Sequence, residues 1–114
     1  MNKLEAIIKG LKRVNPSDMV CYDSNLVNPF FEFIFVATVD SVRQANVSIE
    51  YIKESLEEAG LGIKSYEGFN SGWILIDGYD FLVHVFTEEE RQRVNVDKIY
   101  MNLEKIDLTK YIEE

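Results

Sequence analysis

The segment Phe33–Thr38 (Phe-Ile-Phe-Val-Ala-Thr) constrains the fold most, because it is a nearly continuous β-branched and aromatic run. Such a run is typical of a central strand that is covered on both faces. Ser41 and Gln44 follow with capping-box spacing and begin a helix that ends at Gly60. The apolar residues of this helix step by four and three positions: Ala45, Ile49, Ile52, Leu56 and Ala59. A long helix after a buried strand predicts a crossover to a parallel neighbour.

The remaining apolar patterns add a helix and several strands to this unit. A stripe from Leu4 to Val14 predicts a helix that stops before Asn15-Pro16. Thr87 and Glu90 have the spacing of a second capping box, which begins a short helix. The predicted strands are Asp18–Asp23, Gly62–Glu67 and an antiparallel hairpin of Trp73–Ile76 and Phe81–Phe86. We therefore predict an α+β domain with a mixed sheet of about five strands flanked by helices.

Length and charge restrict the classes of function. The 114 residues are expected to form one domain, in which residues 101–114 make a peripheral C-terminal extension. The net charge of −8 argues against binding nucleic acid through phosphate neutralisation and favours a basic protein partner. The single cysteine and single histidine exclude a Cys/His zinc site, and neither a metal nor a cofactor is expected. A lone cysteine, no signal-peptide core and no apolar run of about 18 residues indicate a cytoplasmic protein.

Two places have the residue types of an enzyme. Asp77 and Asp80 flank a tight turn, where paired carboxylates bind a metal or divide acid and base roles, or simply hydrogen-bond the turn. Asp40 and Ser41 stand between a strand and a helix, a position that suits a phosphate. Val39 occupies the place where glycine would allow close approach, and Asp40 repels anions, so we favour simple capping by Ser41.

The hairpin also has the composition of a protein-binding surface. By strand alternation, Trp73, Leu75 and Asp77 share one face, and Asp80, Leu82, His84 and Phe86 share a face of the next strand. If the faces coincide, an aromatic and aliphatic patch is rimmed by carboxylates, as in a binding hot spot. Trp73 suits the core equally well. We interpret His84 as a hydrogen-bonded structural residue rather than a base, and Cys21 as an inert core thiol.

Several segments, taken in order, resemble the ribosomal silencing factors, the RsfS or Iojap family. The resemblance runs from about Met1 to Tyr100. Departures from the family pattern occur at Phe33, Val39, Val94 and Tyr100. The segments that carry the resemblance are Asp18-Met-Val-Cys-Tyr-Asp23, Glu32-Phe-Ile-Phe-Val-Ala-Thr38, Ser41-Val-Arg-Gln44, Glu67-Gly68 with Trp73 and Asp77, Asp80 with His84-Val-Phe86, and Arg91 with Asn95-Val-Asp-Lys-Ile-Tyr100.

This resemblance implies a nucleotidyltransferase-like fold without catalytic motifs and a protein that is not an enzyme. It implies binding to large-subunit ribosomal protein fourteen, a steric block to subunit joining, repression of translation when nutrients are scarce, and a possible homodimer. It assigns the partner contact to Trp73, Leu75, Asp77, Asp80, Leu82, His84, Phe86 and Arg91. A small nucleotide-binding enzyme and an interaction module with a non-ribosomal partner are the alternatives.

Overall fold

The computed structural model describes residues 2–25 and 28–111 and is built around one parallel pair of strands, β2 (Phe33–Val39) and β5 (Phe81–Thr87). The pair is in register from Phe33 opposite Phe81 to Val39 opposite Thr87. All seven residues of β2 are buried. The predicted central strand and its parallel neighbour are therefore confirmed, and both faces of this pair need a cover.

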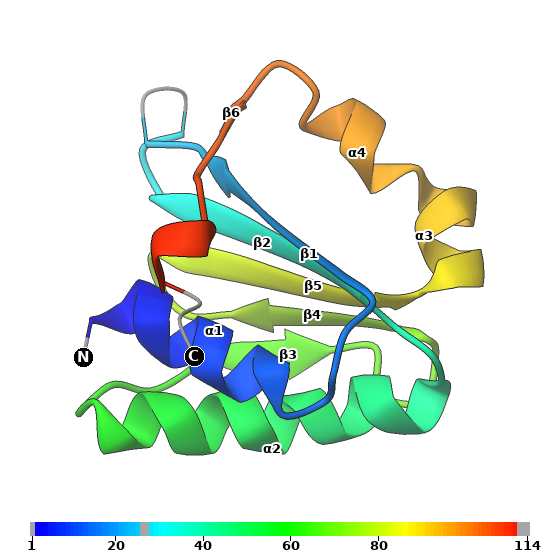
Figure 1. Cartoon of the computed structure of the whole chain (residues 1–114), viewed down its shortest axis with the longest axis horizontal. Helices are drawn as coiled ribbons and strands as arrows, with labels where there is room; N and C mark the ends of the chain where they lie inside the picture. The colour runs from blue at the N-terminus through cyan, green and yellow to red at the C-terminus, as the bar shows by residue number, and fades with distance from the viewer. Residues whose placement is uncertain (1, 26–27, 112–114) are drawn as a thin grey trace.

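The strands form one mixed sheet in the order β3-β4-β5-β2-β1-β6 (Figure 1). Every neighbouring pair except β2–β5 is antiparallel. The prediction of about five strands was one short, because β6 has only two residues and no alternation that a sequence could reveal. The other strands are β1 (Asp18–Asp23), β3 (Ser65–Glu67), β4 (Trp73–Asp77) and β6 (Glu104–Lys105).

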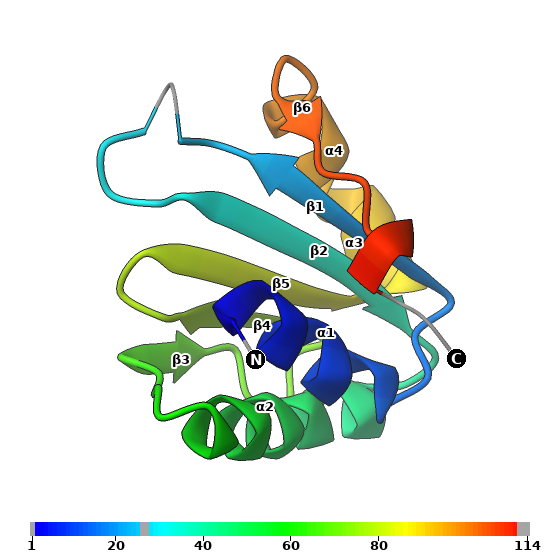
Figure 2. The ribbon, with the colours of Figure 1, turned by 60° about the vertical axis from the view of Figure 1, so that its left-hand side comes forward.

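The helices divide between the two faces of the sheet. α1 (Lys3–Lys12) and α2 (Val42–Glu58) cover one face, while α3 (Glu88–Val94) and α4 (Val96–Ile99) lie on the other (Figure 2). A 3-10 turn, η1 (Thr109–Tyr111), follows β6. The main core lies between the sheet and the α1–α2 layer, and the smaller one lies beneath α3 and α4.

Gln44 joins the two helices of the main layer at one end. Its backbone N–H donates to Ser41 Oγ over 3.1 Å, which caps α2 as the spacing predicts. Its side-chain oxygen accepts from the Asp40 N–H at 2.9 Å, and its side-chain nitrogen donates to the Val14 carbonyl at 3.0 Å. One side chain therefore satisfies backbone groups at the start of α2 and just beyond the end of α1.

The C-terminal segment returns to the sheet after α4. Leu108 is buried in the main core, and Ile106 and Tyr111 pack against that core. Residues 112–114 of the predicted extension lie outside the described residues. Across residues 2–25 and 28–111, we find no helix with the length and apolar character that a membrane span requires.

The closest approach between α1 and α2 depends on Gly10. A Cβ at Gly10 would lie 2.8 Å from the Ile52 Cα and 2.9 Å from the Tyr51 carbonyl oxygen. Both are backbone atoms of α2, so neither can move aside alone. On the same interface, Ser55 Oγ donates to the Ala6 carbonyl over 2.6 Å.

We therefore expect Gly10→Ala to destabilise the protein by about 1–3 kcal/mol, since the helices must separate to admit one methyl group. Urea unfolding followed by circular dichroism measures this change. Gly62→Ala is the matched control, because a Cβ at Gly62 has nothing within 4 Å. Equal stability of the two variants would contradict the proposed close packing.

Candidate functional site

The second face of the sheet is only partly covered by helices. Beneath α3 and α4 lies a small buried cluster, in which Val96 of α4 joins residues of β1, β2 and β5: Tyr22, Ile34, Val36 and Phe86. Four half-buried side chains, Trp73, Leu75, Asp77 and Leu82, lie on the β4–β5 part of this face. Their register places Asp77 opposite Leu82 and Leu75 opposite His84. We call these four residues the β4–β5 patch. The structure thus brings together half of the residues predicted for a partner contact.

A shallow depression lies beside the patch. It has a volume of about 190 Å³ and is lined by Trp73 and Leu75 together with Glu67, Gly68 and Ser71. Glu67 lies opposite Leu75 on β3 and is exposed. The patch and the depression beside it thus combine an apolar centre with two carboxylates, the predicted Asp77 and Glu67, which the sequence did not single out for this site.

The turn between the two strands separates the two aspartates. Asp77 Oδ1 accepts the Tyr79 N–H at 3.0 Å, as expected for an aspartate that stabilises a turn. Asp80 instead forms an ion pair with Lys3 of α1, on the opposite side of the sheet. The prediction that Asp80 shares the face of Leu82 is wrong, because strand alternation begins only at Phe81. The two carboxylates therefore have different partners, which favours the interpretation that Asp77 stabilises the turn.

His84 and Phe86 lie behind the patch rather than on it, with exposed fractions of 5% and 0%. The Trp73 indole N–H donates to His84 Nδ1 over 3.1 Å, and His84 Nε2 lies 3.0 Å from the Tyr100 hydroxyl. The Trp73 ring also stacks on Phe86 with centroids 5.2 Å apart. The interpretation of His84 as a hydrogen-bonded structural residue is confirmed.

The indole partner fixes the tautomer of His84. An indole N–H can only donate, so Nδ1 must carry no proton and the neutral ring bears its proton on Nε2. Nε2 then donates to the Tyr100 oxygen. Burial lowers the pKa of His84 to about 4, which keeps the ring neutral near pH 7.

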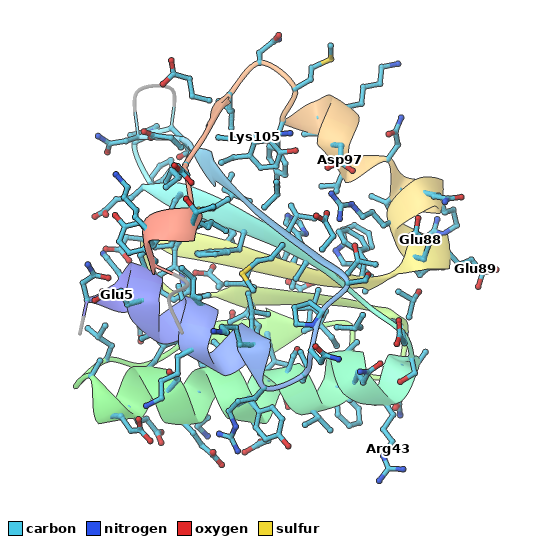
Figure 3. The ribbon with its side chains drawn as sticks, in the orientation of Figure 1. Glu5, Arg43, Glu88, Glu89, Asp97 and Lys105 are labelled. Carbon is cyan, nitrogen blue, oxygen red and sulfur yellow. The ribbon has the colours of Figure 1, made fainter. Side chains whose placement is uncertain are left out.

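Arg91 connects α3 and α4 to the sheet through hydrogen bonds within the chain. Its guanidinium binds both carboxylate oxygens of Asp97, at 2.7 and 3.0 Å. A third nitrogen donates to Asp18 at 2.6 Å and to the Thr38 hydroxyl at 2.7 Å. The hydrogen bond from Arg91 holds the pKa of Asp97 below its usual range, and Asp97 in turn accepts from Tyr22 at 3.1 Å. Figure 3 shows Asp97 on α4, on the side of the sheet away from Arg43 of α2.

Sequence reasoning missed Tyr100, Tyr22 and Asp97 as parts of this site. Asn95, at φ +56°, separates α3 from α4 and sets the direction in which α4 returns across the sheet. No periodic pattern encodes that turn. The only sequence signal was the resemblance of the segment ending at Tyr100, which gave that residue no role.

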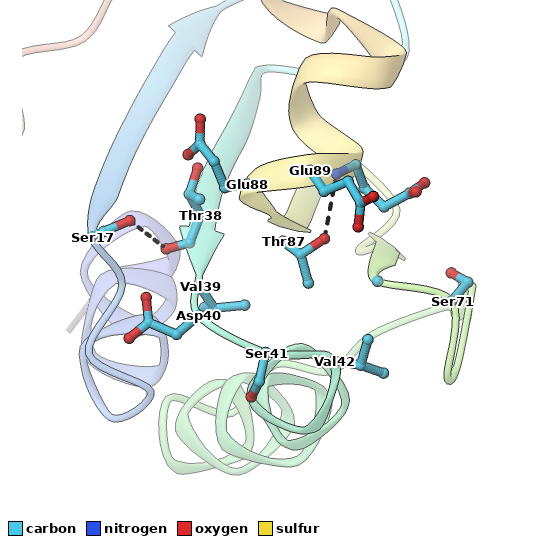
Figure 4. A pocket seen from close by; sticks show the side chains of 12 residues that line it. Ser17, Thr38, Val39, Asp40, Ser41, Val42, Ser71, Thr87, Glu88 and Glu89 are labelled. Carbon is cyan, nitrogen blue, oxygen red and sulfur yellow. Dashed lines mark hydrogen bonds between the residues drawn. The ribbon is translucent and has the colours of Figure 1, made fainter.

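A larger pocket lies at the ends of β2 and β5, with a volume of about 580 Å³ (Figure 4). It occupies the region where the enzyme hypothesis would place a nucleotide. Its acidic lining comes from Asp40, Glu88, Glu89 and Glu90. Carboxylates on two sides of the pocket would repel a phosphate, so this lining disfavours nucleotide binding. Among the residues that the structure describes, no three His, Cys, Asp or Glu side chains group as metal ligands would.

Cys21 lies on β1 and is fully buried in the main core. Burial raises the pKa of its thiol to about 12, so the reactive thiolate is scarce near neutral pH. The predicted position of Cys21 in the core is confirmed.

The pKa of His84 is about 4 in the folded chain and 6.5 ordinarily, so between pH 4 and pH 6.5 the unfolded chain binds more protons than the folded chain. This contribution to stability is present above about pH 6.5 and is lost as the pH falls toward 4. From pH 7 to pH 5 we expect the free energy of unfolding to fall by about 2 kcal/mol more in the wild-type protein than in His84→Gln. Urea titrations at both pH values measure the difference; parallel pH profiles would contradict the buried neutral ring.

We expect Arg91→Lys to destabilise the protein by about 1–2 kcal/mol, since an ammonium cannot replace the fork that binds Asp97, Asp18 and Thr38. Arg93→Lys is the matched control, because Arg93 lies on the same helix, is exposed and, among the described residues, pairs with Glu90 alone. Thermal unfolding of the two variants gives the comparison. Loss of stability in both variants alike would assign the effect to helix α3 in general.

Comparison with known proteins agrees with the observed fold. The family model described as ribosomal silencing factor during starvation, RsfS, matches residues 1–114. A protein named ribosomal silencing factor RsfS from Chromobacterium violaceum is 31% identical over 94 residues, 82% of this chain and 77% of the relative. Its namesake in Bacillus subtilis is 28% identical over 92 residues, covering 80% and 78%.

Two solved structures share the architecture. A crystal structure of a Chromobacterium violaceum protein has a TM-score of 0.80 at 28% identity and covers 89% of this chain and 88% of its own. A Bacillus halodurans structure has a TM-score of 0.79 at 24% identity, covers 92% and 96%, and bears on the fold alone. With a family model that spans all 114 residues, this chain belongs to the ribosomal silencing factor family, RsfS.

Proposed function

We propose that this chain binds large-subunit ribosomal protein fourteen through the β4–β5 patch and prevents the two ribosomal subunits from joining. The observation that carries the proposal is an apolar patch with a carboxylate rim on a protein of net charge −8. Ribosomal proteins are generally basic, so the charges are complementary. Membership of the ribosomal silencing factor family supports a role at the ribosome.

The proposed mechanism is steric and needs no chemical step. The chain measures 32 × 30 × 29 Å, so a bound copy occupies a large area of surface that the small subunit must approach. Trp73, Leu75 and Leu82 would provide the affinity by losing contact with water. Asp77 and Glu67 would set the orientation and the rate of encounter. Translation would then fall when nutrients are scarce, in the cytoplasm, without any cofactor.

Leu75→Glu places a charge in the apolar centre and removes neither hydrogen bond of the Trp73–His84–Tyr100 relay, the chain of side chains behind the patch. We expect it to weaken binding to purified large subunits by at least about 30-fold, the effect of a hot-spot residue. Co-sedimentation over a range of subunit concentrations measures the affinity. Leu61→Glu is the matched control, because Leu61 is exposed beyond the end of α2.

The same two variants test the mechanism in a subunit-joining assay. The wild-type protein and Leu61→Glu should block the joining of isolated subunits, and Leu75→Glu should not. Undiminished binding of a folded Leu75→Glu would show that the patch is not the docking site. Full subunit joining in saturating wild-type protein would refute the proposed function. The alternative of an interaction module with a non-ribosomal partner would then be favoured.

A further inference from the structure

The Trp73 indole is held from two directions by buried groups. Its face stacks on Phe86, with ring centroids 5.2 Å apart and 22° between the planes. Its N–H donates to His84, which is itself bonded to Tyr100. Tyr100 packs in turn on Tyr22 of β1, with ring centroids 5.4 Å apart. A half-buried side chain on the patch is thus connected to α4 and to the far half of the sheet.

We propose that His84 and Tyr100 are positioning residues that fix the Trp73 indole in the orientation required for docking. This inference rests on the proposed function, since it concerns the same surface. Neither residue needs to touch the partner: His84 is 5% exposed and lies behind the indole. Tyr100 acts through His84. Its oxygen accepts the hydrogen bond from His84 Nε2 and so holds His84 in the tautomer whose Nδ1 is free to bind the indole.

The benefit of such positioning is entropic. A free tryptophan on a surface samples several rotamers, and binding must select one of them. Immobilising one side chain costs about 0.5–1.5 kcal/mol on binding, which corresponds to about two- to tenfold in affinity. A ring that is already fixed avoids this cost. The polar contact to His84 adds direction, which stacking on Phe86 alone does not supply.

Charged groups lie near this relay but do not bind His84. Asp97 and Arg91 approach from α4 and α3, and Tyr22 connects them to Tyr100: its hydroxyl donates to Asp97 and its ring packs on the Tyr100 ring. On β4, the nearest carboxylate is that of Asp77, which is engaged by the Tyr79 N–H. The pKa of His84 is lowered by burial, so the neutral form that the geometry requires is also the stable form near pH 7.

The test uses the fact that the chain has one tryptophan, whose indole N–H gives a single NMR resonance. His84→Leu should speed hydrogen exchange of that N–H by at least about tenfold, because its acceptor is lost. The same variant should weaken binding to large subunits by about two- to tenfold. Tyr100→Phe should give smaller changes in the same direction while keeping the ring, and His84→Gln should restore both properties in part.

Ser55→Ala is the control for stability alone, because it removes a buried hydrogen bond to Ala6 on the opposite face of the sheet. It should leave both the indole exchange and the binding unchanged. A released indole with full affinity would overturn the positioning role, and so would unchanged indole exchange in both His84→Leu and Tyr100→Phe. Failure of the wild-type chain to bind subunits would instead overturn the proposed function, and the inference with it.

Discussion

The parallel pairing of β2 with β5 is the constraint on which the rest of the structure depends. All of β2 is buried, and β5 is buried except at Leu82 and Thr87, so most of both faces of the pair must be covered. The segment between them supplies α2, which covers one face together with α1, and the β3–β4 edge of the sheet. The other face receives only the short helices α3 and α4. The part that these helices leave uncovered is the β4–β5 patch, so the candidate site is a direct consequence of uneven coverage.

The two faces of the sheet are stabilised differently. The α1–α2 face relies on close apolar packing, with Gly10 set against the backbone of α2. The opposite face relies on a polar network. Hydrogen bonds connect Arg91, Asp97 and Tyr22, and the Tyr100 ring contacts both Tyr22 and His84. In the described part of the chain, every buried side-chain nitrogen and oxygen has a hydrogen-bond partner. A fully satisfied network holds its members in one geometry, which suits a surface that must present a fixed shape.

The sequence predicted most of the fold because its main elements are periodic or capped. The β2 run, the α2 stripe and the Ser41 cap each encode their structure locally, and the hairpin pattern placed Leu75 and Leu82 on one face. The sequence could not show which candidate residues are exposed on the surface and which are buried beneath it. Arg91 and His84 were expected at a partner contact, yet both are bonded within the fold, because the path of α4 depends on a left-handed residue, Asn95. Asp80 was misplaced for a related reason, since strand alternation does not extend into a turn.

The size of the patch determines what else a partner must touch. A stable interface buries about 800 Å² on each protein, which is roughly an eighth of the 6618 Å² surface of this chain. Four half-buried side chains cannot supply that area. The surface beyond β4 continues onto β3, where Glu67 lies opposite Leu75 and is exposed, and onto the following turn, where Phe69 is 59% exposed. A partner centred on Trp73 would therefore extend across the open edge of the sheet, because α3 and α4 occupy the opposite direction.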